Sequence, residues 1–176
     1  NPPTGYRSIE TNSKIRVDGT TRKVHMLEIV KEEAKTIKLI FSKFLEYKSL
    51  TKVETFMIQN DILTKKGKSF SRFAIKAILL NPVYMIADEQ AWNYFQTADV
   101  EVYCDKTEFD GIHGMMVYNK TSQRTGKSNE YNSIDKWIIA VGKHDGLICG
   151  SDWVQSQMIL NQNKSKSYRK PKSEVA

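Results

Sequence analysis

The sequence predicts an α+β fold, in which a helix-turn-helix-like three-helix bundle precedes a small antiparallel β-containing subdomain with flanking helices. Apolar residues recur at helical spacing between residues 29 and 80, whereas residues 100–141 contain short segments that alternate like strands. The charge changes along the chain as well. Residues 1–86 hold 16 Lys/Arg and 8 Asp/Glu, whereas residues 87–160 hold 6 and 11. We therefore expect two halves of one domain, residues 1–86 and 87–160, followed by a basic linker, residues 161–176.

The composition excludes several classes of protein. The 176 residues are 40% hydrophobic and 27% charged, which is typical of a folded domain. No apolar run approaches the roughly 18 residues of a membrane helix, and the N-terminus is no signal peptide. Cys104 and Cys149 stand outside any C-x-x-C pair, so neither a disulfide framework nor a cysteine zinc site is predicted. We expect a cytoplasmic protein without a cofactor, and the first residue, Asn1, indicates an excised fragment.

The first predicted element is a β-ribbon. Asp18-Gly19 is a hairpin signal, because these residue types suit the left-handed conformations of a two-residue turn. The flanking segments, Lys14–Val17 and Lys23–Leu27, are therefore expected to pair as a short ribbon.

Two amphipathic helices come after the ribbon. Residues 29–47 form the longer one, with an apolar side made of Val30, Ala34, Ile37, Ile40, Phe41, Phe44 and Leu45. The second helix begins after Ser49 or Thr51, whose hydroxyl can accept from an unpaired N–H of the first turn. It ends near Asn60 and buries Leu50, Val53, Phe56 and Met57.

A third helix is predicted over residues 70–80. Ser69 or Ser71 can cap it, and Asn81-Pro82 ends it, because proline cannot continue a helix. Its expected apolar stripe consists of Phe70, Ala74, Ala77 and Ile78.

The second half mixes helices with short strands. Ala87–Ala98 is predicted to be a helix that turns Ala91, Tyr94 and Phe95 inward. Three segments alternate like strands, namely Val100–Cys104, Met115–Tyr118 and Trp137–Val141. Residues 119–134 are polar and are expected to form a surface loop. The last helix, Asp152–Leu160, has Ser151 as its candidate cap and an inner side made of Trp153, Gln157 and Leu160, with Val154 and Met158 nearby.

Cations cluster around the start of the third helix. Lys65, Lys66 and Lys68 precede it, and Arg72 and Lys76 lie four residues apart within it. A helix that packs by one face and presents a basic face from its first turns is typical of proteins that read the major groove of DNA. The fork of Arg72 can bind guanine O6 and N7 together, whereas lysines and a helix N-terminus suit phosphates. The alternative interpretation is a solvated basic surface.

Other patterns lack what their chemistry requires. Two G-K-S triplets end at Ser69 and Ser128, but Ile62 and Thr121 stand where a phosphate loop needs glycine. No rigid spacing unites the acids and histidines of the second half into a metal site; these are Asp105, Glu108, Asp110, His113 and His144. No serine lies in a nucleophile motif, and we expect the three tryptophans to be core residues. Neither a catalytic residue nor a metal ligand is therefore predicted.

An ordered set of short motifs resembles a known family. The motifs are Pro2-Pro3-x-Gly5-Tyr6-Arg7, Glu33-Ala34, Ile40-Phe41, Lys48-Ser49-Leu50, Ile62-Leu63-Thr64-x-x-Gly67-Lys68-x-Phe70-Ser71, Ile75, Ile78-Leu79, Asn81-Pro82-Val83-Tyr84, His144-x-Gly146-Leu147-Ile148, Trp153-Val154-Gln155 and Leu160. In this order they resemble the recombinase domain of large serine recombinases, also called serine integrases. Residues 85–143 match the general pattern less well and are more similar to the conjugative-transposon branch.

The resemblance implies a DNA-binding domain that stands between a resolvase-like catalytic domain and a zinc ribbon. This sequence contains neither neighbour, so we expect it to bind a double-stranded attachment half-site without catalysing a reaction. It is expected to be a monomer alone and a homo-oligomer in the bacterial full-length protein. The expected DNA-binding residues are Arg7, Lys65, Lys66, Lys68, Ser69, Ser71, Arg72, Lys76, Lys164, Lys166, Arg169 and Lys170. Two alternatives are a protein-interaction module that docks through the acidic region, residues 99–145, and a metal-dependent nuclease.

Overall fold

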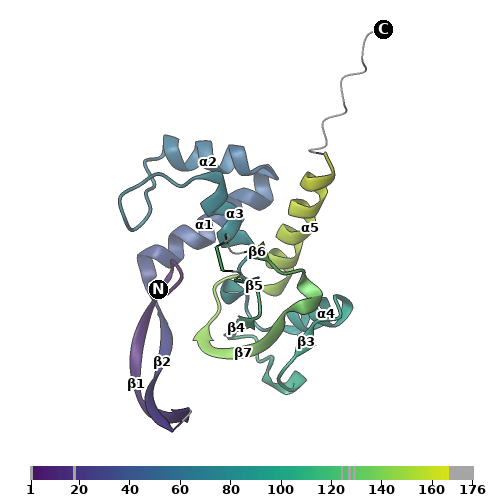
Figure 1. Ribbon diagram of the computed structural model, residues 1–176. Helices are drawn as coiled ribbons and strands as arrows, with labels where there is room; N and C mark the ends of the chain where they lie inside the picture. The colour runs from purple at the N-terminus through teal and green to yellow at the C-terminus, as the bar shows by residue number, and fades with distance from the viewer. Residues whose placement is uncertain (1, 18, 124, 127, 129, 167–176) are drawn as a thin grey trace.

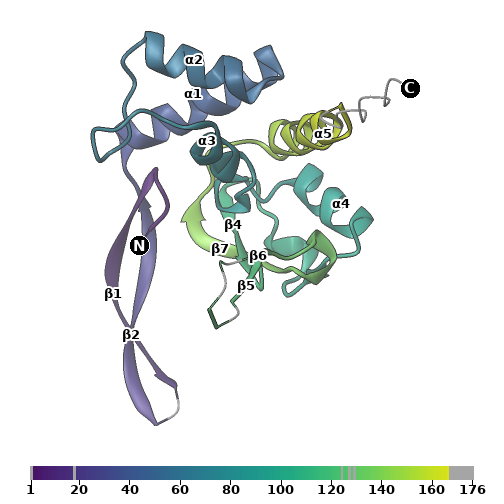
Figure 2. The same ribbon diagram turned by 45° about the horizontal axis from the view of Figure 1, so that its top comes forward.

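The structure is a computed structural model that describes residues 2–17, 19–123, 125–126, 128 and 130–166. Figure 1 shows a β-hairpin that projects from a body of helices and a small sheet, and Figure 2 shows the same projection from a second direction. The α+β class that the sequence predicts is confirmed. Among the described residues, none of the helices has the length and apolarity that crossing a membrane requires.

The hairpin consists of strands β1 (Tyr6–Val17) and β2 (Thr20–Ile29), which pair antiparallel. The predicted ribbon is confirmed, but the hairpin continues farther toward the body than the sequence indicates. The reason is a distant contact, because Tyr6 is buried in the core and its hydroxyl donates a 2.8 Å hydrogen bond to the Asp145 carbonyl. Asp18, in the predicted turn, lies outside the described residues.

Helices α1 (Lys31–Tyr47) and α2 (Leu50–Gln59) confirm the two predicted amphipathic helices. Lys48 separates them in a left-handed conformation, with φ 53°. Ser49 is the N-cap of α2, and its hydroxyl accepts from the Lys52 N–H at 3.4 Å. The buried side chains of the two helices are Ala34, Ile37, Ile40, Phe41, Phe44, Val53 and Met57.

Helix α3 (Arg72–Leu79) is shorter than predicted and buries a different face. Its N-cap is Ser71, whose hydroxyl accepts from the Ala74 N–H at 3.2 Å. The predicted stripe is wrong at Ala77, which is exposed, whereas Phe70 is buried as predicted but precedes the first residue of the helix. The buried side chains of α3 are Ile75, Ile78 and Leu79. These larger side chains remove more apolar area from water than alanines do, and they therefore decide which face packs inward.

The second half is built on a three-stranded sheet in the order β3-β7-β4, with bounds β3 (Glu101–Val102), β4 (His113–Tyr118) and β7 (Ile138–Asp145). The prediction of antiparallel pairing holds for β4 and β7 and is wrong for β3, which runs parallel to β7. A long connection between β3 and β7 makes parallel pairing possible. The segment predicted as a surface loop contains a small antiparallel pair, β5 (Thr121–Ser122) and β6 (Glu130–Tyr131). Short 3₁₀ helices are η1 (Pro82–Tyr84), η2 (Lys106–Glu108) and η3 (Ile134–Lys136).

Helices α4 (Glu89–Thr97) and α5 (Gly150–Lys166) share one residue, Asp88, as the hydrogen-bond acceptor at their N-termini. Asp88 accepts from the Ala91 N–H at 2.9 Å and from the first N–H of α5 at 2.7 Å. The predicted cap, Ser151, lies inside α5 instead, because Asp88 satisfies the start of the helix from another element.

Helix α5 continues through residues 161–166, which the sequence predicts to be part of a linker, so that prediction is wrong for these residues. A tertiary hydrogen bond supports the extra length, since the Asn163 side chain donates to the Lys48 carbonyl at 3.0 Å. Nearer the middle of α5, the Gln157 side chain donates to the Leu79 carbonyl at 2.8 Å and joins α5 to the end of α3.

The hydrophobic core is continuous across both predicted halves. It includes Phe41 and Leu79 from the first half together with Phe95, Ile139 and Trp153 from the second. Helix α5 contacts α1 and α3 of the first half and α4 of the second, and it therefore connects the two halves. This arrangement holds α3 by its inner face and leaves the other face toward solvent.

Candidate nucleic-acid interface

A tight loop carries the lysines that precede α3, and we call residues 64–69 the lysine loop. The Thr64 N–H donates to the Lys68 carbonyl at 2.8 Å, and the Lys68 N–H donates back to Thr64 Oγ1 at 3.2 Å. Gly67, with φ 68°, adopts the left-handed conformation that the turn requires. The loop is therefore closed on itself by hydrogen bonds, and its exposed cations are Lys65, Lys66 and Lys68.

Glu33, in the first turn of α1, connects the lysine loop with the root of the hairpin. Its Oε2 accepts a 2.8 Å hydrogen bond from the Gly5 N–H and lies 4.0 Å from Lys65 Nζ. An exposed ion pair at this distance contributes little stability. Lys66 and Lys68 form no ion pair within the part of the chain that the structure describes. The loop consequently keeps most of its positive charge available to a partner.

Glu54, on α2, fixes the N-terminus of α3. Its carboxylate accepts from the Arg72 N–H at 3.0 Å and lies 3.3 Å from Arg72 Nε. The first turn of α3 thus already has acceptors for the N–H groups of Arg72 and Ala74, the second being the Ser71 hydroxyl. Fewer N–H groups remain for a phosphate than the sequence predicts, and the charge of Arg72 is partly compensated by an acid of the same protein.

The outward face of α3 is centred on Phe73 and Ala77, which lie four residues apart. The side chain of Phe73 is 82% exposed, an unusual fraction for a large apolar residue of a folded protein. At about 100° per residue, Phe73 lies opposite the buried face, and Arg72 and Lys76 flank it on one side. Sequence reasoning misses Phe73 because the predicted stripe runs through Ala74 and Ala77. The observed burial of Ile75, Ile78 and Leu79 is what places Phe73 on the outer face.

The other predicted DNA-binding residues are distributed over the molecule. Arg7 forms an ion pair with Glu28 across the root of the hairpin, and both are largely exposed. Ser69 is exposed in the lysine loop. Lys164 is exposed near the C-terminal end of α5, which lies away from the lysine loop in both views (Figures 1 and 2). Of the remaining three, Lys166 is the last residue of α5, and Arg169 and Lys170 lie outside the described residues.

The histidines and acids of the second half do not converge. Asp110 contacts His113 at 2.5 Å and accepts two backbone N–H bonds, which lower the pKa of this carboxyl to about 2. His144 is buried elsewhere, where its Nε2 donates to the Val83 carbonyl at 2.9 Å and burial lowers its pKa. Gly114 leaves the space for this ring, because a Cβ there would lie 2.3 Å from the His144 Nε2. Across the described residues, no three His, Cys, Asp or Glu side chains are grouped for a metal ion.

The fold and the site together define an α+β domain that presents a closed basic loop beside a short capped helix with an aromatic outer face. The family model described as Recombinase matches residues 31–163, about three quarters of the chain. The chain therefore belongs to the Recombinase family. No curated protein matches it.

Two solved structures are similar to the chain at low identity. "Crystal Structure of a LSR-DNA Complex" has a TM-score of 0.46 and 16% identity, and the match covers 99% of this chain and 36% of that chain. "Sequence Requirements of the Listeria innocua prophage attP site" has a TM-score of 0.44 and 16% identity, covering 95% and 47%. The chain thus spans less than half the length of either one.

Proposed function

We propose that this chain is the domain with which a site-specific serine recombinase binds double-stranded DNA at an attachment half-site, during integration or excision of a mobile element. The observation that carries the proposal is the lysine loop, which is closed by its own hydrogen bonds and leads directly into the capped start of α3. Family membership supports it, since recombinases act on DNA.

The major groove suits the outward face of α3. The groove is about 12 Å wide and admits an α-helix. Phe73 and Ala77 would face the base edges, where an apolar side chain can contact the methyl group of thymine. Lys66 and Lys68 would neutralise phosphates beside the groove, and Lys76 would extend that contact along the helix.

The role of Arg72 changes in this proposal. The sequence favours a contact between Arg72 and guanine, but its Nε already pairs with Glu54. A fixed guanidinium can still contact a base or phosphate through its other nitrogens. We propose that Glu54 orients Arg72 along the groove edge in a helix-turn-helix-like arrangement of α2 and α3.

The finer parts of the proposal concern the whole recombinase. Catalysis would reside in a separate serine-containing domain, and full-length subunits would assemble as homo-oligomers on DNA in the bacterial cytoplasm. Lys164, Lys166, Arg169 and Lys170 would continue the DNA contact toward a zinc ribbon. We retain the division into residues 1–86 and 87–160 as a functional one, with the DNA-reading surface in the first half.

Selection of duplexes from a random-sequence pool, followed by fluorescence anisotropy, tests the function. We expect an enriched sequence that the chain binds more tightly than a scrambled duplex. Lys66→Gln/Lys68→Gln should weaken binding to both duplexes alike, because phosphate contacts carry no sequence information. Recovery of no preferred sequence, together with no duplex binding at low salt, would contradict the proposal.

One observation favours a second function, a protein-interaction module. Tyr103 and Ile112 are 77% and 59% exposed in the acidic second half, near Glu101, Asp105 and Glu108. Exposed apolar side chains rimmed by charges are typical of protein-binding surfaces. Sedimentation with candidate basic proteins would support this alternative if Tyr103→Ser/Ile112→Ser abolished a complex while DNA affinity stayed undetectable.

A further inference from the structure

The two ends of the hairpin differ in how they relate to the rest of the fold. Leu27 and Ile29 of β2 pack against the core, and Tyr6 of β1 is buried in it. Thr11, Ser13 and Val24 still line a cavity beside β4 and β7, whereas Lys14 and Lys23 are exposed, and the tip of the hairpin projects away from the body in both views (Figures 1 and 2). A two-stranded hairpin is at best marginally stable in water by itself. The tip, which projects beyond the part that packs on the domain, is therefore suited to contact a partner.

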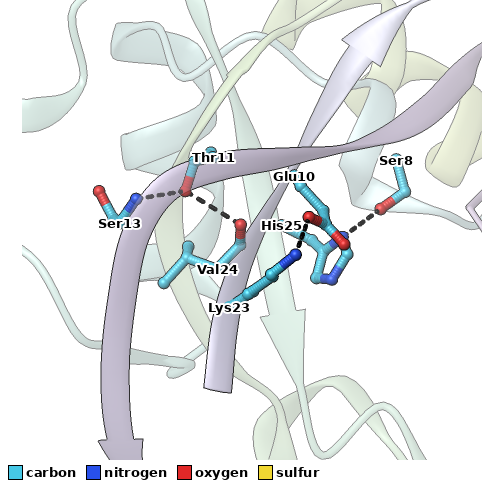
Figure 3. A network of polar contacts seen from close by, with 7 residues as sticks. All are labelled: Ser8, Glu10, Thr11, Ser13, Lys23, Val24 and His25. Carbon is cyan, nitrogen blue, oxygen red and sulfur yellow. Dashed lines mark hydrogen bonds and ion pairs between the residues drawn. The ribbon is translucent and has the colours of Figure 1, made fainter. Parts of the chain in front are cut away.

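A hydrogen-bonded irregularity separates the root of the hairpin from its tip. The pairing shifts between Glu10 and Lys14, so that three residues of β1 face Val24 alone. Figure 3 shows that the Thr11 hydroxyl donates to the Val24 carbonyl, at 2.9 Å, and accepts from the Ser13 N–H, at 3.3 Å. These contacts replace the missing ladder hydrogen bonds. Such irregularities bend a ribbon and therefore set the direction in which its tip points.

The tip beyond the irregularity is basic. Four residue pairs form it, and the register places Lys14 directly opposite Lys23. Like charges at opposite positions of a ribbon repel each other. Lys23 reaches back to Glu10, at 2.6 Å, whereas Lys14 forms no ion pair within the described residues. By sequence, Arg16 and Arg22 add two more positive charges to these four residue pairs, which contain no acidic residue.

We propose that the hairpin tip, formed by residues 14–17 of β1 and residues 20–23 of β2, is a second DNA-binding element, which enters a groove of the same duplex that the lysine loop and α3 bind. The inference rests on the proposed function but concerns a different part of the chain, which precedes the matched family region. A two-stranded ribbon fits the major groove, and polyanionic DNA complements the charge of the tip.

The geometry connects the two elements on one side of the molecule. Glu33 accepts from the Gly5 N–H at the hairpin root and lies beside Lys65 of the lysine loop, so the hairpin starts close to the loop. The 12 residues of β1 span about 40 Å at the usual rise per residue. The tip can therefore contact DNA about one helical turn, ~34 Å, from the loop.

The test compares two variants on two duplexes chosen from the selected sequence. One duplex extends at least a full turn beyond the part protected by α3, and the other ends there. Lys14→Gln/Arg16→Gln/Arg22→Gln should make the salt dependence of log K less steep on the long duplex by up to about 2.7, since each phosphate contact contributes about 0.9. On the short duplex the variant should bind like the wild type.

The controls separate this inference from the proposed function. Lys66→Gln/Lys68→Gln should weaken binding to both duplexes, and the charge-preserving Lys14→Arg/Arg16→Lys/Arg22→Lys should bind the long duplex like the wild type. Equal salt slopes for the hairpin variant and the wild type on the long duplex would overturn the inference while the loop still binds. Loss of binding on both duplexes by the hairpin variant, with an unchanged melting temperature, would also overturn it, because the tip would then act within the first groove.

Discussion

The helical half and the sheet-containing half of this domain share a core but present opposite surfaces. The helical half exposes the lysine loop and α3, and its excess of cations is concentrated around a helix with an aromatic outer face. The other half exposes an excess of acids, and its histidines are either buried or paired with a neighbouring carboxylate. In the proposed function, this division of charge would let the acidic half support the basic one while the basic half faces a polyanion.

The largest expected effect tests whether the two halves fold together. Phe44→Ala, in α1, removes a fully buried ring and should reduce the free energy of unfolding by about 3–5 kcal/mol. All three tryptophans lie in the second half, at positions 92, 137 and 153. Tryptophan fluorescence and helical circular dichroism should therefore shift to the same lower denaturant midpoint. A fluorescence transition that stays at the wild-type midpoint would show that the halves unfold separately.

The next effect concerns Asp88, whose carboxylate accepts hydrogen bonds at the N-termini of both α4 and α5. Asp88→Ala removes acceptors from both α4 and α5 and should cost about 2 kcal/mol, since one cap contributes about 1 kcal/mol. Ser71→Ala removes a single cap, from α3, and should cost about half as much. Urea unfolding of both variants measures the difference. Equal losses would contradict a shared role for Asp88 in the second half.

These elements illustrate what the sequence can and cannot predict. The helices α1 and α2 can be predicted from periodicity and the Ser49 cap, because both signals are local. Contacts between residues far apart in the chain decide the rest. The root of the hairpin is joined to the body by the hydrogen bond from Tyr6 to Asp145, and the extra turns of α5 are accompanied by the hydrogen bond from Asn163 to Lys48. Neither contact can be read from spacing.

The candidate site divides in the same way. A run of lysines around a glycine correctly predicts an exposed basic loop. The pairing of Arg72 with Glu54 joins residues 18 apart and is invisible to a local pattern. The outward position of Phe73 can be deduced only once the buried face of α3 is known, because an eight-residue helix offers too few turns to fix the stripe.

A smaller effect distinguishes a contact with a DNA base from electrostatic contacts with the phosphates. Phe73→Ala should leave stability nearly unchanged, because the ring is exposed, and should weaken binding to the selected duplex about fivefold, for about 1 kcal/mol of apolar contact. Replacing single thymines with deoxyuridine removes only the methyl group. We expect one such replacement to weaken the wild type and to leave Phe73→Ala unaffected, as anisotropy can measure. If every replacement weakens both proteins equally, Phe73 does not read a thymine.

The smallest effect is a pH dependence that originates in the second half. Burial lowers the pKa of His144 from its ordinary value of 6.5, so the unfolded chain takes up a proton at a higher pH than the folded chain does. The free energy of unfolding should therefore be fully maintained above pH 6.5 and should fall as the pH decreases from 6.5 toward the lower, folded pKa. Urea unfolding at several pH values should show this slope in the wild type and in the exposed-site variant His25→Gln. A matching slope in His144→Gln would assign the dependence to another group.

The salt dependence of DNA binding tests the division of charge most directly. The matched pair of variants is Lys66→Gln/Lys68→Gln in the basic half and Lys106→Gln/Lys136→Gln in the acidic half, which remove equal charge from exposed positions. Relative to the wild type, we expect the slope of log K against log salt to become less steep by about 1.8 for the lysine-loop variant and to stay unchanged for the other. Equal changes in the two slopes would contradict a DNA-binding surface located at the lysine loop and α3.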